Sequence, residues 1–177
     1  MEKSLKSVAI NYGLYLSLIL VAYTIIGYAV NIELLVNFWL VMLILPLIVI
    51  SFGVVSAAKS KSLLNGFISF KQAFSSYFIT IAVAVLISTL VTFILFNYID
   101  PDAAIMLKEI VLEKTTTLME NFGAPASEIE KAVVEMEKQD TFAIGTQVKS
   151  LAQGFIFYSI IGLIVALIMK KTDPDLA

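Results

Sequence analysis

Four long apolar runs dominate the pattern of the chain. They cover Val8 to Val30, Val36 to Ala58, Ala73 to Ile99 and Phe142 to Met169. A helix rises about 1.5 Å per residue, so the first run reaches roughly 34 Å, enough for a hydrocarbon core about 30 Å thick. The pattern predicts four membrane-spanning helices. Pro46 lies near the middle of the second run and is expected to kink that helix.

Between the third and fourth runs, over residues 100–141, the pattern becomes amphipathic. Asp100-Pro101 is typical of a helix start, with a capping carboxylate followed by proline at the first helical position. Ser127, with Glu130 three residues later, predicts a capping box and a second start. The apolar stripe of the first helix recurs at helical spacing: Ala104, Leu107, Val111, Leu118 and Phe122. The two helices predicted in this hairpin are Pro101–Asn121 and Ser127–Gln139.

The distribution of lysines predicts how the chain is oriented. One set falls in the two terminal segments and the loop between the second and third runs: Lys3, Lys6, Lys59, Lys61, Lys71, Lys170 and Lys171. The segment from Asp100 to Lys149 instead carries ten acidic residues and five lysines. By the positive-inside rule, the lysine-rich side is cytoplasmic. Both termini are therefore expected in the cytoplasm, and residues 100–141 are expected to form an extracytoplasmic insertion.

Composition narrows the chemistry that is available. The chain is 59% apolar and 15% charged, against roughly 45–50% and 25% in soluble domains. It has no Cys and no His, and all twelve basic residues are Lys. Zinc sites of the usual kind, thiol chemistry and Ser-His catalysis are therefore not expected. A net charge of −2 without a basic cluster argues against nucleic acid. We expect no metal, no cofactor and no catalytic residues, and the acidic residues are read as a solvated face.

Two sets of residues in the runs are candidates for a role. Ser88, Thr92 and Gln153 form a candidate polar seam. One interpretation is a path for a solute, and the favoured one is hydrogen bonding within and between helices. The second set consists of small residues four apart: Gly13 with Ser17, Gly53 with Ala57, and Gly162 with Ala166. Such pairs let helix backbones approach closely, within the chain by default, or in a homodimer or a contact with a foreign helix.

Three segments carry a resemblance to a known family: Tyr12-Gly13-Leu14, the stretch from Gly66 to Phe74 (GFISFKQAF), and Phe96 to Pro101 (FNYIDP). Together they resemble a bacterial membrane family catalogued as domain of unknown function 4199, in a layout that covers nearly the whole chain. The resemblance implies a small four-helix protein of a Gram-negative inner membrane. It implies no activity, substrate or catalytic residue.

The expected fold is all-α, one membrane domain over residues 1–177, in which a four-helix bundle carries the hairpin between its third and fourth spans. The expected function is that of a non-catalytic accessory or scaffold subunit of a bacterial inner-membrane assembly. The alternative is a small oligomeric transporter or lipid-handling component. The expected partners are the lipid bilayer and either another membrane protein or further copies of the chain.

Overall fold

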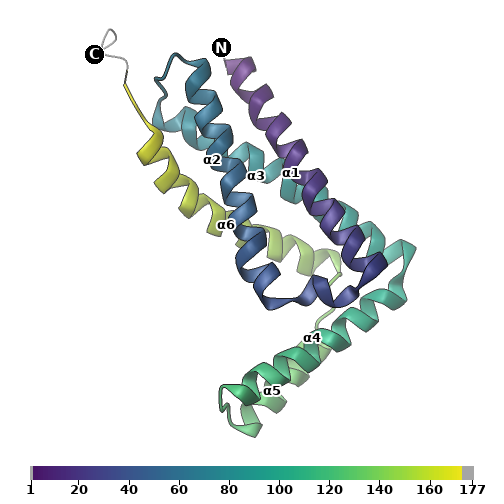
Figure 1. The fold of residues 1–177 in the computed structure, drawn as a ribbon. Helices are drawn as coiled ribbons and strands as arrows, with labels where there is room; N and C mark the ends of the chain where they lie inside the picture. The colour runs from purple at the N-terminus through teal and green to yellow at the C-terminus, as the bar shows by residue number, and fades with distance from the viewer. Residues whose placement is uncertain (1, 173–177) are drawn as a thin grey trace.

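The structure is a computed structural model that describes residues 2–172, with the side chains of residues 4–172, and within these bounds it is built of helices (Figure 1). Six are α-helices: α1 (Glu2–Val30), α2 (Leu45–Leu63), α3 (Phe70–Ile94), α4 (Pro101–Asn121), α5 (Ala126–Lys138) and α6 (Ile144–Met169). Three are short: the 3-10 helix η1 (Ile32–Val36) and the π turns η2 (Leu40–Ile44) and η3 (Leu95–Ile99). Met1 and residues 173–177 of the expected domain, and the side chain of Lys3, lie outside this description.

Four helical stretches are long and apolar enough to cross a membrane: Ser4–Val30, Leu40–Leu63, Phe70–Ile99 and Ile144–Met169. The prediction of four such helices is confirmed, with shifted ends. The second candidate span begins at Leu40 and not at Val36. The chain turns helical at Phe38, after Asn37, which accepts the Leu40 N–H at 3.1 Å and separates this helix from η1. The third begins at Phe70 and not at Ala73, because Ser69 and Gln72 form a capping box that starts the helix earlier.

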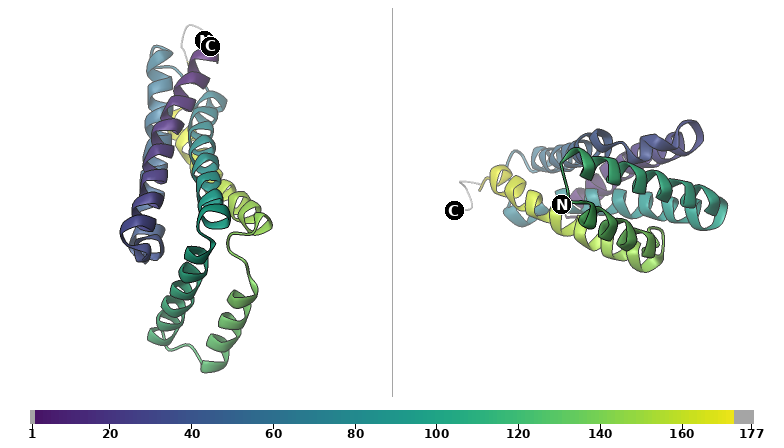
Figure 2. Two further views of the ribbon diagram at one scale, coloured as in Figure 1. Left: turned by 90° about the vertical axis from the view of Figure 1, so that its right-hand side faces the viewer. Right: turned by 90° about the horizontal axis from the view of Figure 1, so that it is seen from below.

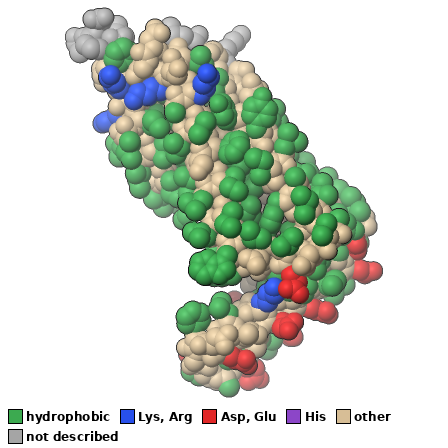
Figure 3. All heavy atoms as spheres, viewed as in Figure 1, with side chains coloured by type: hydrophobic (Ala, Val, Ile, Leu, Met, Phe, Trp, Pro, Cys, Tyr) green, Lys and Arg blue, Asp and Glu red, His purple; other side chains and the backbone are tan. Residues whose placement is uncertain are grey.

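Apolar side chains also cover the outside of these helices (Figure 3). Along α6, four isoleucines recur every fourth residue, and each is more than half exposed: Ile156, Ile160, Ile164 and Ile168. Residues four apart lie on one face of a helix, so this row forms a continuous apolar surface. Such a surface suits hydrocarbon and not water.

Helix α3 occupies the centre of the long helices, since α1, α2 and α6 each contact it. Two side chains of α3, Tyr77 and Ile81, are buried against Leu16 of α1 and Val49 of α2. The close fit depends on glycine. A Cβ atom on Gly53 of α2 would lie 2.6 Å from the Tyr77 ring. The ring of Tyr77 therefore rests directly on the backbone of α2.

At Pro46, where the sequence predicted a kink, the structure has a π turn directly before the proline. Pro46 has no N–H to donate, so a regular α-helical ladder cannot continue through it. The preceding turn, η2, widens so that the Leu45 N–H reaches the Leu40 carbonyl, five residues back. The helix thus passes the proline without ending, as π turns inside α-helices allow.

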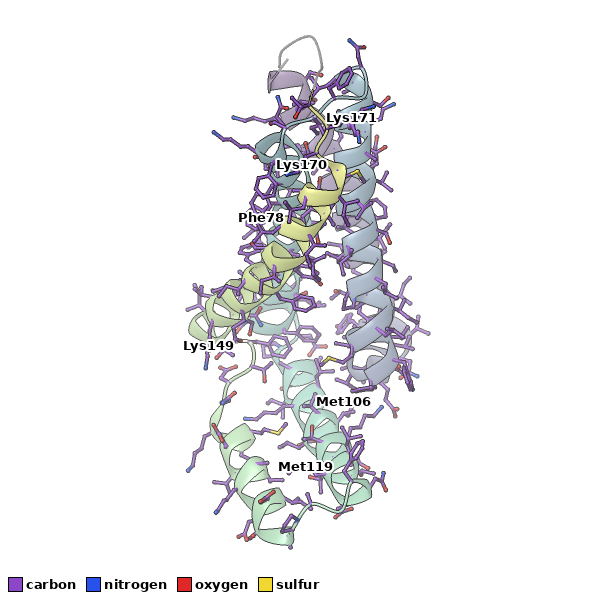
Figure 4. All side chains as sticks on the ribbon, turned by 90° about the vertical axis from the view of Figure 1, so that its left-hand side faces the viewer. Phe78, Met106, Met119, Lys149, Lys170 and Lys171 are labelled. Carbon is purple, nitrogen blue, oxygen red and sulfur yellow. The ribbon has the colours of Figure 1, made fainter. Side chains whose placement is uncertain are left out.

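The two ends of the long helices differ. At one end, the strand-like residues Ile68 and Lys171 pair antiparallel, with N–H to carbonyl distances of 3.0 and 2.9 Å. The Lys171 ammonium also lies 5.3 Å from the centre of the Phe67 ring. These contacts join the end of α6 to the α2–α3 loop. We call this the basic end, because Lys59, Lys61, Lys71 and Lys170 lie at the helix ends that adjoin it. Figure 3 shows lysine side chains gathered at this end, and Figure 4 labels Lys170 and Lys171.

Helices α4 and α5 form a hairpin that extends beyond the opposite end of the long helices (Figure 2). The predicted helix Pro101–Asn121 is confirmed. The predicted capping box at Ser127 is wrong, because α5 begins one residue earlier, at Ala126. The Pro125 carbonyl accepts the N–H groups of Glu128 and Ile129, so Ser127 already lies inside the first turn.

Candidate functional site

A cluster of buried hydroxyl groups joins α1, α2 and α3 near the basic end. Thr80 Oγ1 lies 2.8 Å from Ser56 Oγ and 3.0 Å from the Ala9 carbonyl oxygen. Ser76 donates to Ser60 Oγ at 2.8 Å. All four hydroxyl side chains are at most 2% exposed. Hydrogen bonds between spanning helices of this kind are worth about 0.6–2 kcal/mol each, so the cluster fixes the register of three helices.

Sequence reasoning did not identify this hydroxyl cluster. Thr80 stands out as a polar residue inside a run, whereas Ser56, Ser60 and Ser76 lie close to the polar ends of theirs. The signal was the repeat: Ser56 and Ser60 are four apart on α2, and Ser76 and Thr80 are four apart on α3. Two such pairs on neighbouring helices present facing hydroxyl groups.

The residues of the candidate polar seam have different surroundings. Ser88 donates its hydroxyl to the Val85 carbonyl of its own helix at 3.1 Å. Thr92 lies one turn further along α3 and is half-buried. Gln153 lies on α6 with an exposed side chain. The hydroxyl of Ser88 is thus satisfied locally, and Gln153 faces outward.

The candidate helix-packing residues lie at close approaches. A Cβ on Gly13 would lie 2.8 Å from the Val83 Cβ atom, and one on Gly162 would lie 2.7 Å from the Tyr77 ring. Gly53 and Gly162 therefore flank the same ring, from α2 and from α6. The other three are buried side chains: Ser17, Ala57 and Ala166.

The junction between the long helices and the hairpin is built around Asp100. As predicted, Asp100 caps α4, accepting the Ala103 N–H at 3.0 Å. The structure adds Tyr28 of α1, whose hydroxyl donates to the same carboxylate at 2.9 Å. The Ala103 N–H, and then the Tyr28 hydroxyl, hold the pKa of Asp100 below its ordinary value. Asp100 therefore stays ionised and ties α1 to the start of the hairpin.

Apolar packing supports this junction. Phe96 of η3 stacks on Phe142, with ring centroids 4.5 Å apart, and both rings are buried. Asn97 donates to the Phe142 carbonyl at 3.1 Å, so the returning chain is held against the end of α3. On the far side, Lys114 of α4 pairs with Glu33 at 3.0 Å. The hairpin is attached at three places and not through a single loop.

An apolar groove of about 460 Å³ opens between α4 and the segment that joins η1 to η2. Its walls include Phe38, Trp39 and Met42 on one side and Leu118 on the other, and these four are 43–66% exposed. The ion pair of Lys114 with Glu33 lies beside it. Large exposed apolar side chains grouped in this way typically mark a surface that binds protein or lipid. We call it the outer groove.

The acidic side chains do not converge. Over the part of the chain that the structure describes, no three carboxylates gather closely enough to hold a metal ion. The carboxylates of Asp100 and Asp140 are engaged in capping N–H groups, at Ala103 and at Phe142 and Ala143.

These features define a helical protein with four helices that are long and apolar enough to cross a membrane and with a small helical hairpin at one end. The chain belongs to the family described as protein of unknown function DUF4199, whose profile matches residues 11–171. The resemblance predicted from the sequence is therefore confirmed. Comparisons with curated proteins and with solved structures gave no match.

Proposed function

We propose that the protein is a non-catalytic accessory or scaffold subunit of a bacterial inner-membrane assembly. In this proposal the four long helices form a membrane-spanning bundle, and α4 and α5 form an extracytoplasmic hairpin. The outer groove binds an apolar helix of another envelope protein. The observation that supports it most directly is a groove with four large exposed apolar side chains, carried by a hairpin attached at three places.

Charge supports the orientation in this proposal. Lysines gather at the basic end, whereas the hairpin carries most of the acidic residues (Figure 3). Lysines and arginines are retained on the cytoplasmic side of inner membranes, so the basic end is placed in the cytoplasm. The exposed ring of Trp39 lies near the other end of a span, where amphipathic aromatic side chains are enriched.

The position of the outer groove supports a helical partner. One wall is the beginning of the second span and the other is α4, so the groove lies at the edge of the apolar surface. The Lys114–Glu33 pair gives this edge a charged border. A partner helix with an apolar face and a polar border would match both parts. The proposal includes no catalytic step, in keeping with a chain that has no Cys and no His.

Orientation is tested first, because the natural chain has no Cys and single-cysteine variants give no background labelling. Lys59→Cys and Glu128→Cys both place the thiol at an exposed position, at the basic end and on the hairpin respectively. A membrane-impermeant maleimide added to spheroplasts should label the Glu128→Cys variant only. Labelling of Lys59→Cys alone would overturn the orientation.

The partner is tested with two variants of the hairpin. Leu118→Gln changes the outer groove, and Val134→Gln changes a side chain of similar exposure, 40% against 43%, that does not line it. Purification in a mild detergent from the native host should recover one envelope protein at a fixed ratio with the natural chain and Val134→Gln, and lose it with Leu118→Gln. Solute flux or turnover by the purified protein alone would refute the scaffold proposal and favour the transporter alternative.

A further inference from the structure

A second cavity lies at the basic end, between the first turns of α1 and α3. It encloses about 330 Å³ and is lined by two lysines, Lys6 and Lys71, with Gln72 and Ser75 beside them. Small-molecule sites typically span roughly 300–1,000 Å³, so the cavity is large enough for a headgroup. It is separate from the outer groove, which lies at the opposite end of the long helices.

The cavity favours an anion. Two ammonium groups line it, and no carboxylate does so among the described residues. Gln72 uses its side-chain oxygen to accept the Ser69 N–H at 3.0 Å, which leaves the amide nitrogen as a donor. Helices α1 and α3 both begin at this end, so the positive ends of two helix dipoles face the same region.

The cavity also has an apolar side that leads into the membrane region. Lys71, Ser75 and Ile79 are four residues apart, so they follow one face of α3. Ile79 lies eight residues, or about 12 Å, deeper along the helix than Lys71. Leu5 of α1 adds a second apolar side chain to the lining. Along α3 the wall therefore changes from charged to polar to apolar with depth, as a phospholipid does from headgroup to acyl chain.

We propose that this cavity binds the phosphodiester headgroup of an anionic phospholipid. Lys6 and Lys71 contact the phosphate, Gln72 and Ser75 donate hydrogen bonds to it, and the acyl chain follows Ile79 into the bilayer. Basic pockets between spanning helices are known to take such headgroups. A free phosphate ion would contact the two lysines but would leave the apolar wall uncovered. The inference takes only the orientation from the proposed function, which places the site in the cytoplasmic leaflet, and does not depend on the outer groove.

The test measures lipid retention by native mass spectrometry on the full chain in detergent. The probes are phosphatidylglycerol, phosphatidylcholine and inorganic phosphate. The site variant is Lys6→Gln with Lys71→Gln. The matched control is Lys59→Gln with Lys170→Gln, which removes the same charge from exposed lysines at the same end that do not line the cavity. A third variant, Ser75→Leu, fills the cavity and keeps both charges.

Each lysine near a membrane surface contributes about fivefold to anionic lipid binding, so the site variant should retain phosphatidylglycerol about twenty-five-fold more weakly. Ser75→Leu should lose retention too, and phosphatidylcholine should be retained weakly by every variant. The proposal is overturned if the control weakens binding as much as the site variant, because charge alone then explains retention. It is equally overturned if phosphatidylcholine is retained as well as phosphatidylglycerol, or if millimolar inorganic phosphate displaces the lipid.

Discussion

The ring of Tyr77 offers the sharpest test of how the long helices fit together. It lies between two glycines, Gly53 of α2 and Gly162 of α6, and is fully buried. In Gly162→Ala the new methyl group would lie 2.7 Å from Tyr77 Cδ1 and 2.8 Å from Cε1. Carbon atoms prefer about 3.5–4.0 Å, so the ring would have to move by about 0.8 Å. The backbone of Gly53 blocks that movement on the other side.

The expected cost follows from these distances. Inserting a methyl group into a well-filled core typically costs about 1–3 kcal/mol, and here neither side can yield, so the upper half of that range applies. Alanine gains up to about 1 kcal/mol over glycine through helix propensity. Gly154→Ala is the matched control on the same helix, since nothing lies within 4 Å of its Cβ position. The two variants should therefore differ by about 2–3 kcal/mol, with Gly154→Ala at or above natural stability.

The assay is equilibrium unfolding of the purified protein in mild detergent, followed by circular dichroism. A double-mutant cycle with Tyr77→Leu makes the test specific, because a smaller side chain leaves room for the methyl group. In that background the cost of Gly162→Ala should fall to the level of the control. The reasoning is refuted if Gly162→Ala and Gly154→Ala have equal stability, or if the penalty persists once Tyr77 is replaced.

Three further predictions use the same assay. Tyr77→Phe should leave stability unchanged or raise it by about 1 kcal/mol, because the Tyr77 hydroxyl has no hydrogen-bond partner among the described residues; a clear loss would show that it has one. Gly13→Ala should cost about 1–3 kcal/mol, since its Cβ would lie 2.9 Å from the Thr80 carbonyl oxygen, and a neutral result would contradict the close approach of α1 to α3. Because the folded-state pKa of Asp100 is lowered, its contribution is fully present above the ordinary value of 3.8 and is lost as pH falls through the folded pKa. Acidification should therefore destabilise the natural chain more than Asp100→Asn, and equal pH profiles would contradict this.

The long helices could be predicted from sequence because each depends mainly on its own residues. A run without charges that is long enough to cross a bilayer forms a helix whatever its neighbours are, since backbone groups in hydrocarbon must be satisfied internally. The start of α4 was also local, set by Asp100 and Pro101. The start of α5 could not be predicted from local sequence in this way. Both Pro125 and Ser127 are residues at which a helix can begin, and the sequence does not show which of the two is used.

The contacts between helices could not be predicted in the same way. The pairing of Ile68 with Lys171 joins residues about a hundred positions apart, and neither carries a local signal for it. The hydrogen bond from Tyr28 to Asp100 is similar. Gln153 was chosen as a polar residue in an apolar run, yet its side chain is exposed. Polarity alone did not identify the inner face of α6.

Side-chain size distinguishes the inner face better than polarity does. On α3 four of the six buried positions are small, namely Ala73, Ser76, Thr80 and Ala84, and the other two are Tyr77 and Ile81. The exposed positions further along are large: Leu86, Leu90 and Ile94, each at least 41% exposed. Lipid is as apolar as leucine, so burying a large apolar side chain gains little over leaving it in the bilayer. Close approach of backbones then decides which face turns inward, and small or hydroxyl-bearing residues permit that approach. A row of small residues four apart therefore predicts the packed face of a spanning helix even where the hydrophobic pattern is uniform.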